Sequence, residues 1–323
     1  MNTMQKKLYL GMLVLCGVGM AGTAPSMGGS SGGGGGLAEK NFVMAHQNIA
    51  NYASICLASA ACRLTTDQTT LLDKIVRQMP GEGRAEVQLV FDSEKANPGM
   101  FYLDGAVRVA KTGGKVGDTI YVNRDMLYTK DASGVTNAMT LPTAVAILVH
   151  ELGHHHGATD HTALDALGGK VEAYLGQHSQ VLDGWLWDVP IRVTAIYPVG
   201  NSPKATPLKG FTQVIFSDTD SLFDITPQIE ALDVCYEQRT DTFVPAQASF
   251  VYNMAWEQHS YYLNHLGDPG PGFKYMRVNA DKVATCGANG DTIGGYWIDL
   301  LLRLAPDGAV LGIEKVFVEK QVF

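Results

Sequence analysis

The stretch His150-Glu151-Leu152-Gly153-His154-His155-His156-Gly157-Ala158-Thr159-Asp160-His161 contains five of the nine histidines in the chain. His150 and His154 are four residues apart, and Glu151 directly follows the first of them. On an α-helix this spacing places both imidazoles on one face, one turn apart, where they can bind a single metal ion. The glutamate lies beside them, where its carboxylate can accept a proton from a water molecule at that ion. The stretch therefore predicts a helix that carries a zinc (Zn²⁺) site.

The neighbouring residues predict how this helix is packed. Pro142 suits a first helical turn, and residues 144–149 are almost wholly apolar. We therefore expect the helix to start near Pro142 and to be buried on most sides, and such packing fixes the geometry of metal ligands. Histidines on a solvated surface are the plain alternative, but this helix has no obvious wet face. Gly157 is expected to end it, and a second helix is expected from about Thr162 to Leu182.

A catalytic zinc site needs a third protein ligand and one open position. Asp160 follows Gly157, at which the chain can turn back toward the metal. Here the stretch resembles the metzincin pattern HExxHxxGxxH, with aspartate in place of the last histidine. The variant HExxHxxGxxD followed by histidine is that of the snapalysin family of small secreted peptidases. This resemblance, which covers only the quoted stretch, implies that His150, His154 and Asp160 hold zinc and that Glu151 is the general base.

Two other residues remain candidates for the third ligand. Glu172 lies on the second expected helix, which is similar to the gluzincin arrangement, in which a glutamate on a second helix completes the site. His161 is the next histidine after the glycine. Asp160 also has a structural alternative, because aspartate is a preferred N-cap and the second helix begins next to it.

Other polar residues near the motif have weaker claims to the site. Asp165 is a candidate for orienting a ligand histidine by accepting its second ring N–H, although an exposed helical aspartate is as good an interpretation. His155 and His156 lie off the face shared by His150 and His154, so we expect them not to be ligands.

The rest of the chain predicts an α+β fold. Residues 39–79 have a helical pattern, and strands are expected near 85–91, 100–110 and 118–123. They would form a small mixed sheet that, with the motif helix and the helix after it, makes a zincin-like catalytic domain at 39–184. Beyond Gly184, strand-like runs occur at 189–198, 210–217, 248–254, 295–304 and 310–318, the last two joined by a turn at 306–308. We expect a β-rich C-terminal domain at 185–323.

The N-terminus has the features of an export signal. Lys6 and Lys7 precede a short apolar run, and small residues follow, so we expect a signal peptide at 1–24. A Gly/Ser-rich linker is expected at 25–38. The protein would then be secreted or periplasmic. Lipoprotein anchoring through Cys16 is the less favoured alternative, because Leu15 is bulky for such a signal.

Four cysteines remain after the expected signal, and an even number in an exported chain suggests disulfides. Three pairings are possible, and local spacing favours Cys56–Cys62 and Cys235–Cys286. Residues 38–80 are also open to interpretation as a propeptide, in which Cys56 or Cys62 would bind the zinc and keep the enzyme latent. We favour the disulfide interpretation over this one.

Composition limits the partners. The net charge is −8 and basic residues are not clustered, which argues against nucleic acid. The apolar run near the N-terminus is too short for stable membrane insertion. We expect a secreted zinc-dependent metalloendopeptidase that acts on a protein or peptide substrate, its oligomeric state left open. The alternatives are a secreted zinc-binding module for adhesion or recognition without catalysis, and a zinc amidase acting on a non-peptide or cell-wall amide.

Overall fold

The motif helix is α4 (Leu141–His155) in the computed structural model, which describes residues 36–78, 88–132, 134, 136–183, 192–196, 213–218, 222–237, 242–246, 248–257, 267–286 and 291–321. The hydroxyl of Thr140 accepts a hydrogen bond from the N–H of Thr143 and caps the first turn, which contains Pro142. The helix ends before Gly157, whose φ of 81° continues no helix. The predicted start and end of this helix are confirmed.

The region predicted to be helical before the sheet forms three α-helices rather than one. These are α1 (Leu37–Gln47), α2 (Ile49–Leu57) and α3 (Thr66–Gln78), with a short 3₁₀ turn at Ala60–Cys62. Because α1 already begins at Leu37, the helical region takes in the last two residues of the expected linker. The expected signal peptide and residues 25–35 of that linker lie outside the described residues.

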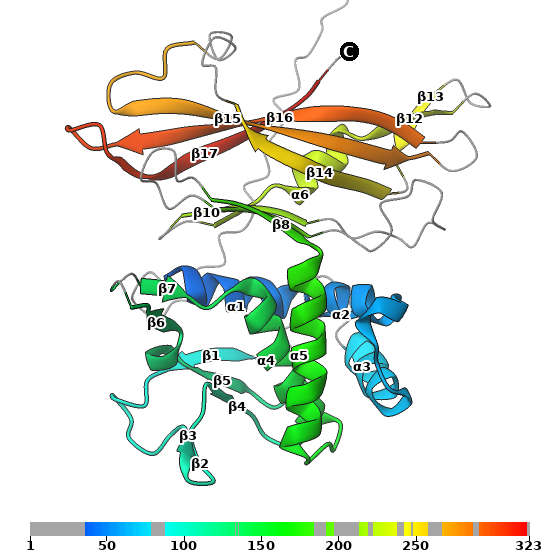
Figure 1. The fold of residues 1–323 in the computed structure, drawn as a ribbon, viewed down its shortest axis with the longest axis vertical. Helices are drawn as coiled ribbons and strands as arrows, with labels where there is room; N and C mark the ends of the chain where they lie inside the picture. The colour runs from blue at the N-terminus through cyan, green and yellow to red at the C-terminus, as the bar shows by residue number, and fades with distance from the viewer. Residues whose placement is uncertain are drawn as a thin grey trace, which may run out of the picture. The chain divides into compact units, whose positions relative to one another are not determined.

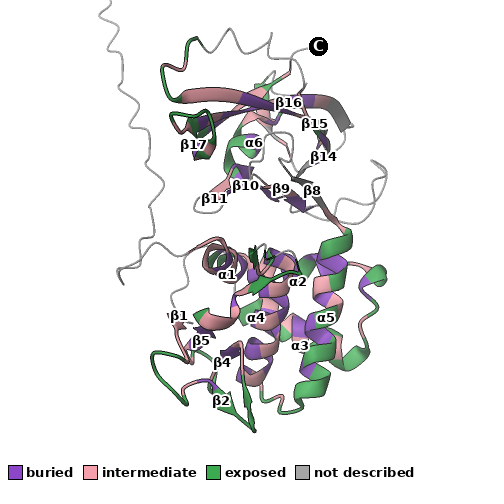
Figure 2. Ribbon diagram, turned by 60° about the vertical axis from the view of Figure 1, so that its left-hand side comes forward, coloured by how far each residue is buried: buried purple, intermediate pink, exposed green. Residues whose placement is uncertain are grey.

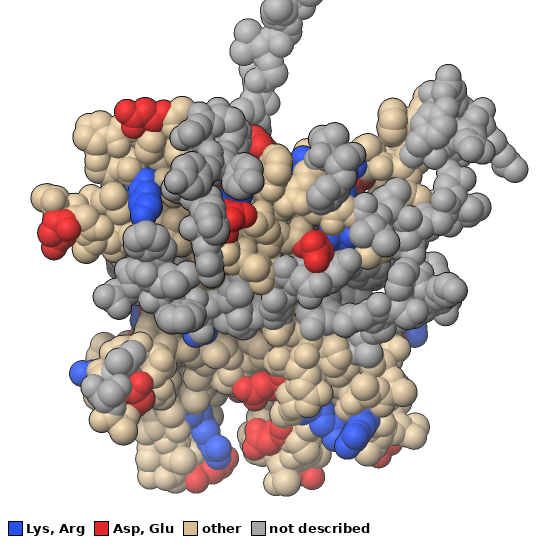
Figure 3. Space-filling model, turned by 45° about the horizontal axis from the view of Figure 1, so that its top comes forward, with Lys and Arg blue, Asp and Glu red and all other residues tan. Residues whose placement is uncertain are grey.

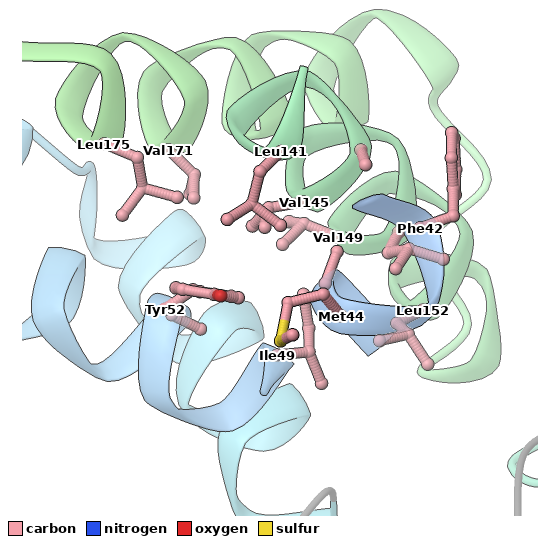
Figure 4. Packing of buried hydrophobic residues seen from close by; sticks show 14 of the residues in the cluster. Phe42, Met44, Ile49, Tyr52, Leu141, Val145, Val149, Leu152, Val171 and Leu175 are labelled. Carbon is pink, nitrogen blue, oxygen red and sulfur yellow. The ribbon is translucent and has the colours of Figure 1, made fainter. Parts of the chain in front are cut away.

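The first three helices and α4 share one hydrophobic core (Figure 4). Phe42 of α1, Tyr52 of α2 and Leu72 of α3 are fully buried in it, beside Val145 and Val149 of α4. Cys56 and Cys62 are joined to each other in a disulfide, as local spacing predicted. Residues 37–78 therefore pack against the motif helix, and their two cysteines form a disulfide with each other.

A three-stranded mixed sheet lies beside these helices, as predicted. Its order is β1 (Leu89–Asp92), β5 (Ile120–Asn123), β4 (Ala110–Lys111), with β1 parallel to β5 and β4 antiparallel to it. The prediction of one strand over 100–110 was wrong. The chain there folds into the hairpin β2 (Tyr102–Leu103) and β3 (Ala106–Val107) before it reaches β4, because Asp104 and Gly105 take positive φ values of 51° and 81°. A second hairpin, β6 (Tyr128–Lys130) and β7 (Thr136–Ala138), leads into α4.

Helix α5 (His161–Gln177) packs directly against α4 (Figure 1). One side of α5 is buried and the other is exposed (Figure 2). A Cβ atom at Gly168 of α5 would lie 2.7 Å from the carbonyl oxygen of Ala146, and one at Gly153 of α4 would lie 2.3 Å from a methyl carbon of Leu164. At Gly168 the two helix backbones therefore approach more closely than a residue with a side chain would allow, whereas at Gly153 the contact is with the leucine side chain.

The second helix ends earlier than predicted. Residues 179–182, expected as its last turn, are part of strand β8 (Ser179–Asp183), which pairs with β9 (Arg192–Ile196). This pairing places β8 in a sheet with strands from beyond the boundary predicted at 184/185. The contacts of the chain group all residues from Gly35 to Phe323 into one compact unit.

The C-terminal region is rich in β-structure, as predicted. One sheet has the order β11-β10-β9-β8, and a second is the antiparallel meander β14-β15-β16-β17 (Figure 1). The further elements here are β10 (Gln213–Ser217), β11 (Leu222–Asp224), α6 (Thr226–Leu232), the pair β12 (Val234–Glu237) and β13 (Thr242–Pro245), β14 (Ala248–Trp256), β15 (Phe273–Thr285), β16 (Asp291–Leu304) and β17 (Val310–Lys320).

Alternate residues of β16 lie in a second hydrophobic core, which belongs to the C-terminal region. Tyr296, Ile298, Leu300 and Leu302 are buried in one cluster, as period-2 alternation requires. The turn before β17 lies at the predicted place, with Gly308 at a φ of 87°. Cys235 and Cys286 form the second predicted disulfide. Taken together, the fold is α+β. Among the helices of the described residues, none combines the length and apolarity that crossing a bilayer takes.

The close approach of α4 and α5 can be tested with two adjacent glycines. Gly168→Ala places a methyl group against the backbone of α4, so we expect it to lower the free energy of unfolding by about 1–3 kcal/mol. Gly169 has no atom within 4 Å of an added Cβ, so Gly169→Ala is expected to raise it by up to about 1 kcal/mol through helix propensity. Urea denaturation measures both. Equal effects of the two substitutions would show that the helices are not in contact at Gly168.

Candidate metal centre

Three histidines place ring nitrogens close together at one end of α4 and the start of α5. One ring nitrogen from each of His150, His154 and His161 lies within 4.8 Å of the other two. Nε2 of His150 is 3.2 Å from Nε2 of His154 and 3.1 Å from Nδ1 of His161. His150 and His154 are half-buried, whereas His161 is exposed. The predicted sharing of one face by His150 and His154 is confirmed.

The second ring nitrogens of the helical pair fix their tautomers. Nδ1 of His154 is 2.8 Å from the carbonyl oxygen of Ala158, which can only accept, so this nitrogen carries the proton. Nδ1 of His150 is 2.8 Å from a carboxylate oxygen of Asp165 and carries the proton for the same reason. In the neutral rings both Nε2 atoms therefore present lone pairs to each other. Facing lone pairs repel, and a cation between them removes that repulsion.

The spacing of these nitrogens suits zinc. Two nitrogen ligands about 2.0–2.1 Å from a tetrahedral ion lie roughly 3.3 Å apart. The two separations from Nε2 of His150, 3.1 and 3.2 Å, are close to that value. Three imidazoles with a fourth position open are also a common ligand set of catalytic zinc, although imidazole suits copper, iron and nickel as well. The three imidazoles lie close enough together to hold a divalent metal ion, and zinc is compatible with them.

Asp160 is not part of this cluster, contrary to the ligand set implied by the resemblance. Its carboxylate accepts a hydrogen bond from the N–H of Ala163, 3.2 Å away, and caps the first turn of α5. The cap sets the backbone at the start of the helix, and His161 is the first helical residue. The structure thus favours His161 over Asp160 as the third ligand. The sequence signal was the N-cap preference of an aspartate directly before an amphipathic helix.

The other polar residues of the motif region have separate partners. Glu172 accepts a hydrogen bond from the hydroxyl of Thr143 at 2.7 Å and does not join the three histidines. His155 is buried, with Nε2 2.7 Å from the hydroxyl of Thr112 in the segment after β4. Neither His155 nor His156 belongs to the cluster, in agreement with the expectation. The contact of Asp165 with His150 is the orienting one that the sequence suggested.

Glu151 lies next to the cluster and is almost buried, with 7% of its surface exposed. Burial raises the pKa of Glu151 to about 7, with a smaller raising effect from Asp165 and a lowering one from Arg108. A carboxyl group with this pKa can take up and release a proton near neutral pH.

These residues line a cleft of about 680 Å³. One wall comes from α4 and α5, and includes His150, Glu151, His154 and His161. The opposite wall is the segment 107–114, which contains β4 at the edge of the three-stranded sheet. The hydrogen bond between Thr112 and His155 ties this wall to the end of α4. The cleft thus has the candidate ligands and the buried carboxyl group on one side and a strand edge on the other.

Charged side chains are interspersed by sign on the face that Figure 3 shows, with no extended basic patch among the described residues drawn there.

Comparisons with known proteins give no relative for this chain: no family model, curated protein or solved structure matches it. The function is therefore inferred from the site alone.

The third ligand can be identified by two substitutions at adjacent positions. His161→Ala removes one of the three nitrogens, so we expect the affinity for zinc to fall at least tenfold. Asp160→Ala removes only the helix cap, so it should lower the free energy of unfolding by about 1 kcal/mol and leave most zinc binding intact. Competition with a chromophoric chelator measures the affinity. The reverse order of effects would favour Asp160 as the ligand.

The orienting role of Asp165 has its own test. In Asp165→Asn the side chain no longer carries the charge that favours a proton on Nδ1 of His150, so we expect zinc affinity to fall by about 10–100-fold. Asp165 is 73% exposed at the side chain, so the stability of the apoprotein should change little. Chelator competition and thermal denaturation of the metal-free protein separate the two effects. Unchanged affinity would contradict the role.

Proposed function

We propose that this protein is a zinc-dependent endopeptidase of the zincin type, with His150, His154 and His161 as ligands and Glu151 as the general base. One observation carries the proposal: three imidazole nitrogens converge in a cleft that is also lined by the nearly buried carboxyl group of Glu151. The motif's spacing on a buried helix supports the same conclusion.

When bound, zinc supplies Lewis acidity, which makes water more acidic and a carbonyl more electrophilic. The carboxylate of Glu151 accepts the proton of the attacking water and then delivers it to the nitrogen of the leaving amine. Asp165 and the carbonyl of Ala158 hold the rings of His150 and His154 in the tautomer that ligation requires.

The opposite wall of the cleft supports a peptide as the substrate. β4 is an edge strand of the sheet and lines the cleft together with the rest of segment 107–114. An extended peptide can add to such an edge through main-chain hydrogen bonds, which places its carbonyl groups along the cleft. An unfolded or flexible polypeptide is therefore the substrate class we propose.

Export is part of the proposal. The two disulfides, Cys56–Cys62 and Cys235–Cys286, are of the kind that persists in an oxidising compartment.

The role of Glu151 is tested by Glu151→Gln. The amide cannot accept the proton, so we expect hydrolysis of casein to fall by about 10²–10⁴-fold, while zinc content stays at one ion per chain. Glu172→Gln is the matched control, because it changes a carboxyl group in the same cleft that contacts Thr143 and no candidate ligand. This control should keep most of the activity.

A screen of the wild-type protein separates the rival functions. Zinc without turnover of casein or of a peptide library would favour a binding module. Hydrolysis of cell-wall amides but of no peptide would favour the amidase. Full activity of Glu151→Gln would contradict the assigned base.

A further inference from the structure

Among the described residues of the C-terminal region, two oppositely charged pairs are buried, and they differ in how their carboxylate oxygens are hydrogen-bonded. Arg277 donates from two nitrogens to both carboxylate oxygens of Asp299, at 2.6 and 2.7 Å. Lys282 donates to Oδ1 of Asp233, and Oδ2 of that carboxylate is buried with no hydrogen-bond partner among the residues that the structure describes. Lys282 and Asp233 are each only 1% exposed. A buried carboxylate with an unpaired oxygen is unfavourable, so this pair calls for another explanation.

The surroundings of Lys282 direct its amine toward Asp233. In β15, Lys282 pairs with Gly294 of β16, and a Cβ atom at that glycine would lie 3.2 Å from Cε of the lysine. The glycine therefore leaves room for the lysine stem. Nζ lies 4.8 Å from the ring centroid of Tyr296, which is fully buried. The amine is thus held in an apolar, water-poor environment with a carboxyl group in contact.

A disulfide holds the segment that contains Asp233 beside the strand that contains Lys282. Asp233 lies between the end of α6 and β12, where Cys235 is found, and Cys286 directly follows β15. The bond between these cysteines keeps the segment of Asp233 beside the strand of Lys282. Two groups fixed in contact react as if at very high local concentration.

We propose that Lys282 and Asp233 condense to form an intramolecular amide (isopeptide) bond. A proton passes from the ammonium to the carboxylate, Nζ attacks Cγ, and the bond from Cγ to one oxygen breaks. That oxygen leaves as water, with the proton it gained and one more from the amine. No oxidant or other reactant is needed. The product has one carbonyl oxygen, one N–H and no charge, so both buried charges and the unpaired oxygen are removed.

The chemistry of the two basic side chains explains why only one pair reacts. Burial lowers the pKa of Lys282 to about 8, and the nearby Lys320 lowers it further, so part of the amine is neutral and nucleophilic near neutral pH. The guanidinium of Arg277 does not lose its proton in proteins, so its pair with Asp299 remains ionic.

The test is the intact mass of the full chain after reduction and unfolding. We expect the measured mass of the wild-type protein to be lower, by the mass of one water, than the mass calculated from its sequence. The calculation starts at the N-terminal residue determined for the purified protein. Lys282→Arg and Asp233→Ala should each restore the full mass. Asp281→Asn, which changes an exposed carboxyl group next to Lys282, should keep the deficit.

A proteolytic digest supplies the second measurement and does not depend on how the variants fold. We expect one branched peptide that joins the segment of Asp233 to that of Lys282. A wild-type mass without the deficit would overturn the proposal. So would a deficit that persists in Lys282→Arg, which would indicate a cyclic imide at an aspartate, or one lost in Asp281→Asn.

Discussion

The candidate metal centre depends on the short distance between α4 and α5. At Gly168 the backbone of α5 lies so close to that of α4 that a methyl group would collide with the carbonyl oxygen of Ala146, and the side chain of Leu164 packs against Gly153. This approach sets the first turn of α5 against the last turns of α4, so that His161 and Asp165 reach the pair on α4. Without it, a helix with two histidines would remain, but not a site with three nitrogens.

Hydrogen bonds around the rings then determine what the site can bind. Each histidine of the helical pair gives its Nδ1 proton to an oxygen, so that its Nε2 lone pair is available to a cation. The carbonyl of Ala158 takes part in this only because the chain turns at Gly157. The same turn leads to the cap by Asp160 and so to His161. Helix termination, capping and ligand orientation are thus one local arrangement.

Buried polar groups mark both places at which we propose chemistry. Glu151 is a carboxyl group whose proton affinity is raised by burial, beside a cleft that a substrate can enter. Lys282 and Asp233 are almost fully buried and in contact with each other. The physical cause is the same, because low polarity favours the neutral forms of acids and amines. The outcome differs with access to solvent and substrate. Glu151 lines a cleft and can exchange protons repeatedly, whereas the buried pair of Lys282 and Asp233 can react only once.

The amino-acid sequence by itself determined what depends on near neighbours along the chain. Helix periodicity placed His150 and His154 on one face, glycine and proline marked the ends of α4, and short spacing paired the cysteines correctly. The tertiary structure decided the rest. It favoured His161 over Asp160, because the choice depends on a helix cap and on the distance between two helices. It also made a strand of residues 273–285, which the sequence pattern did not indicate. Lys282 interrupts the apolar alternation of Met276, Val278, Ala280 and Ala284, and its burial there is accompanied by a contact with Asp233 on another segment.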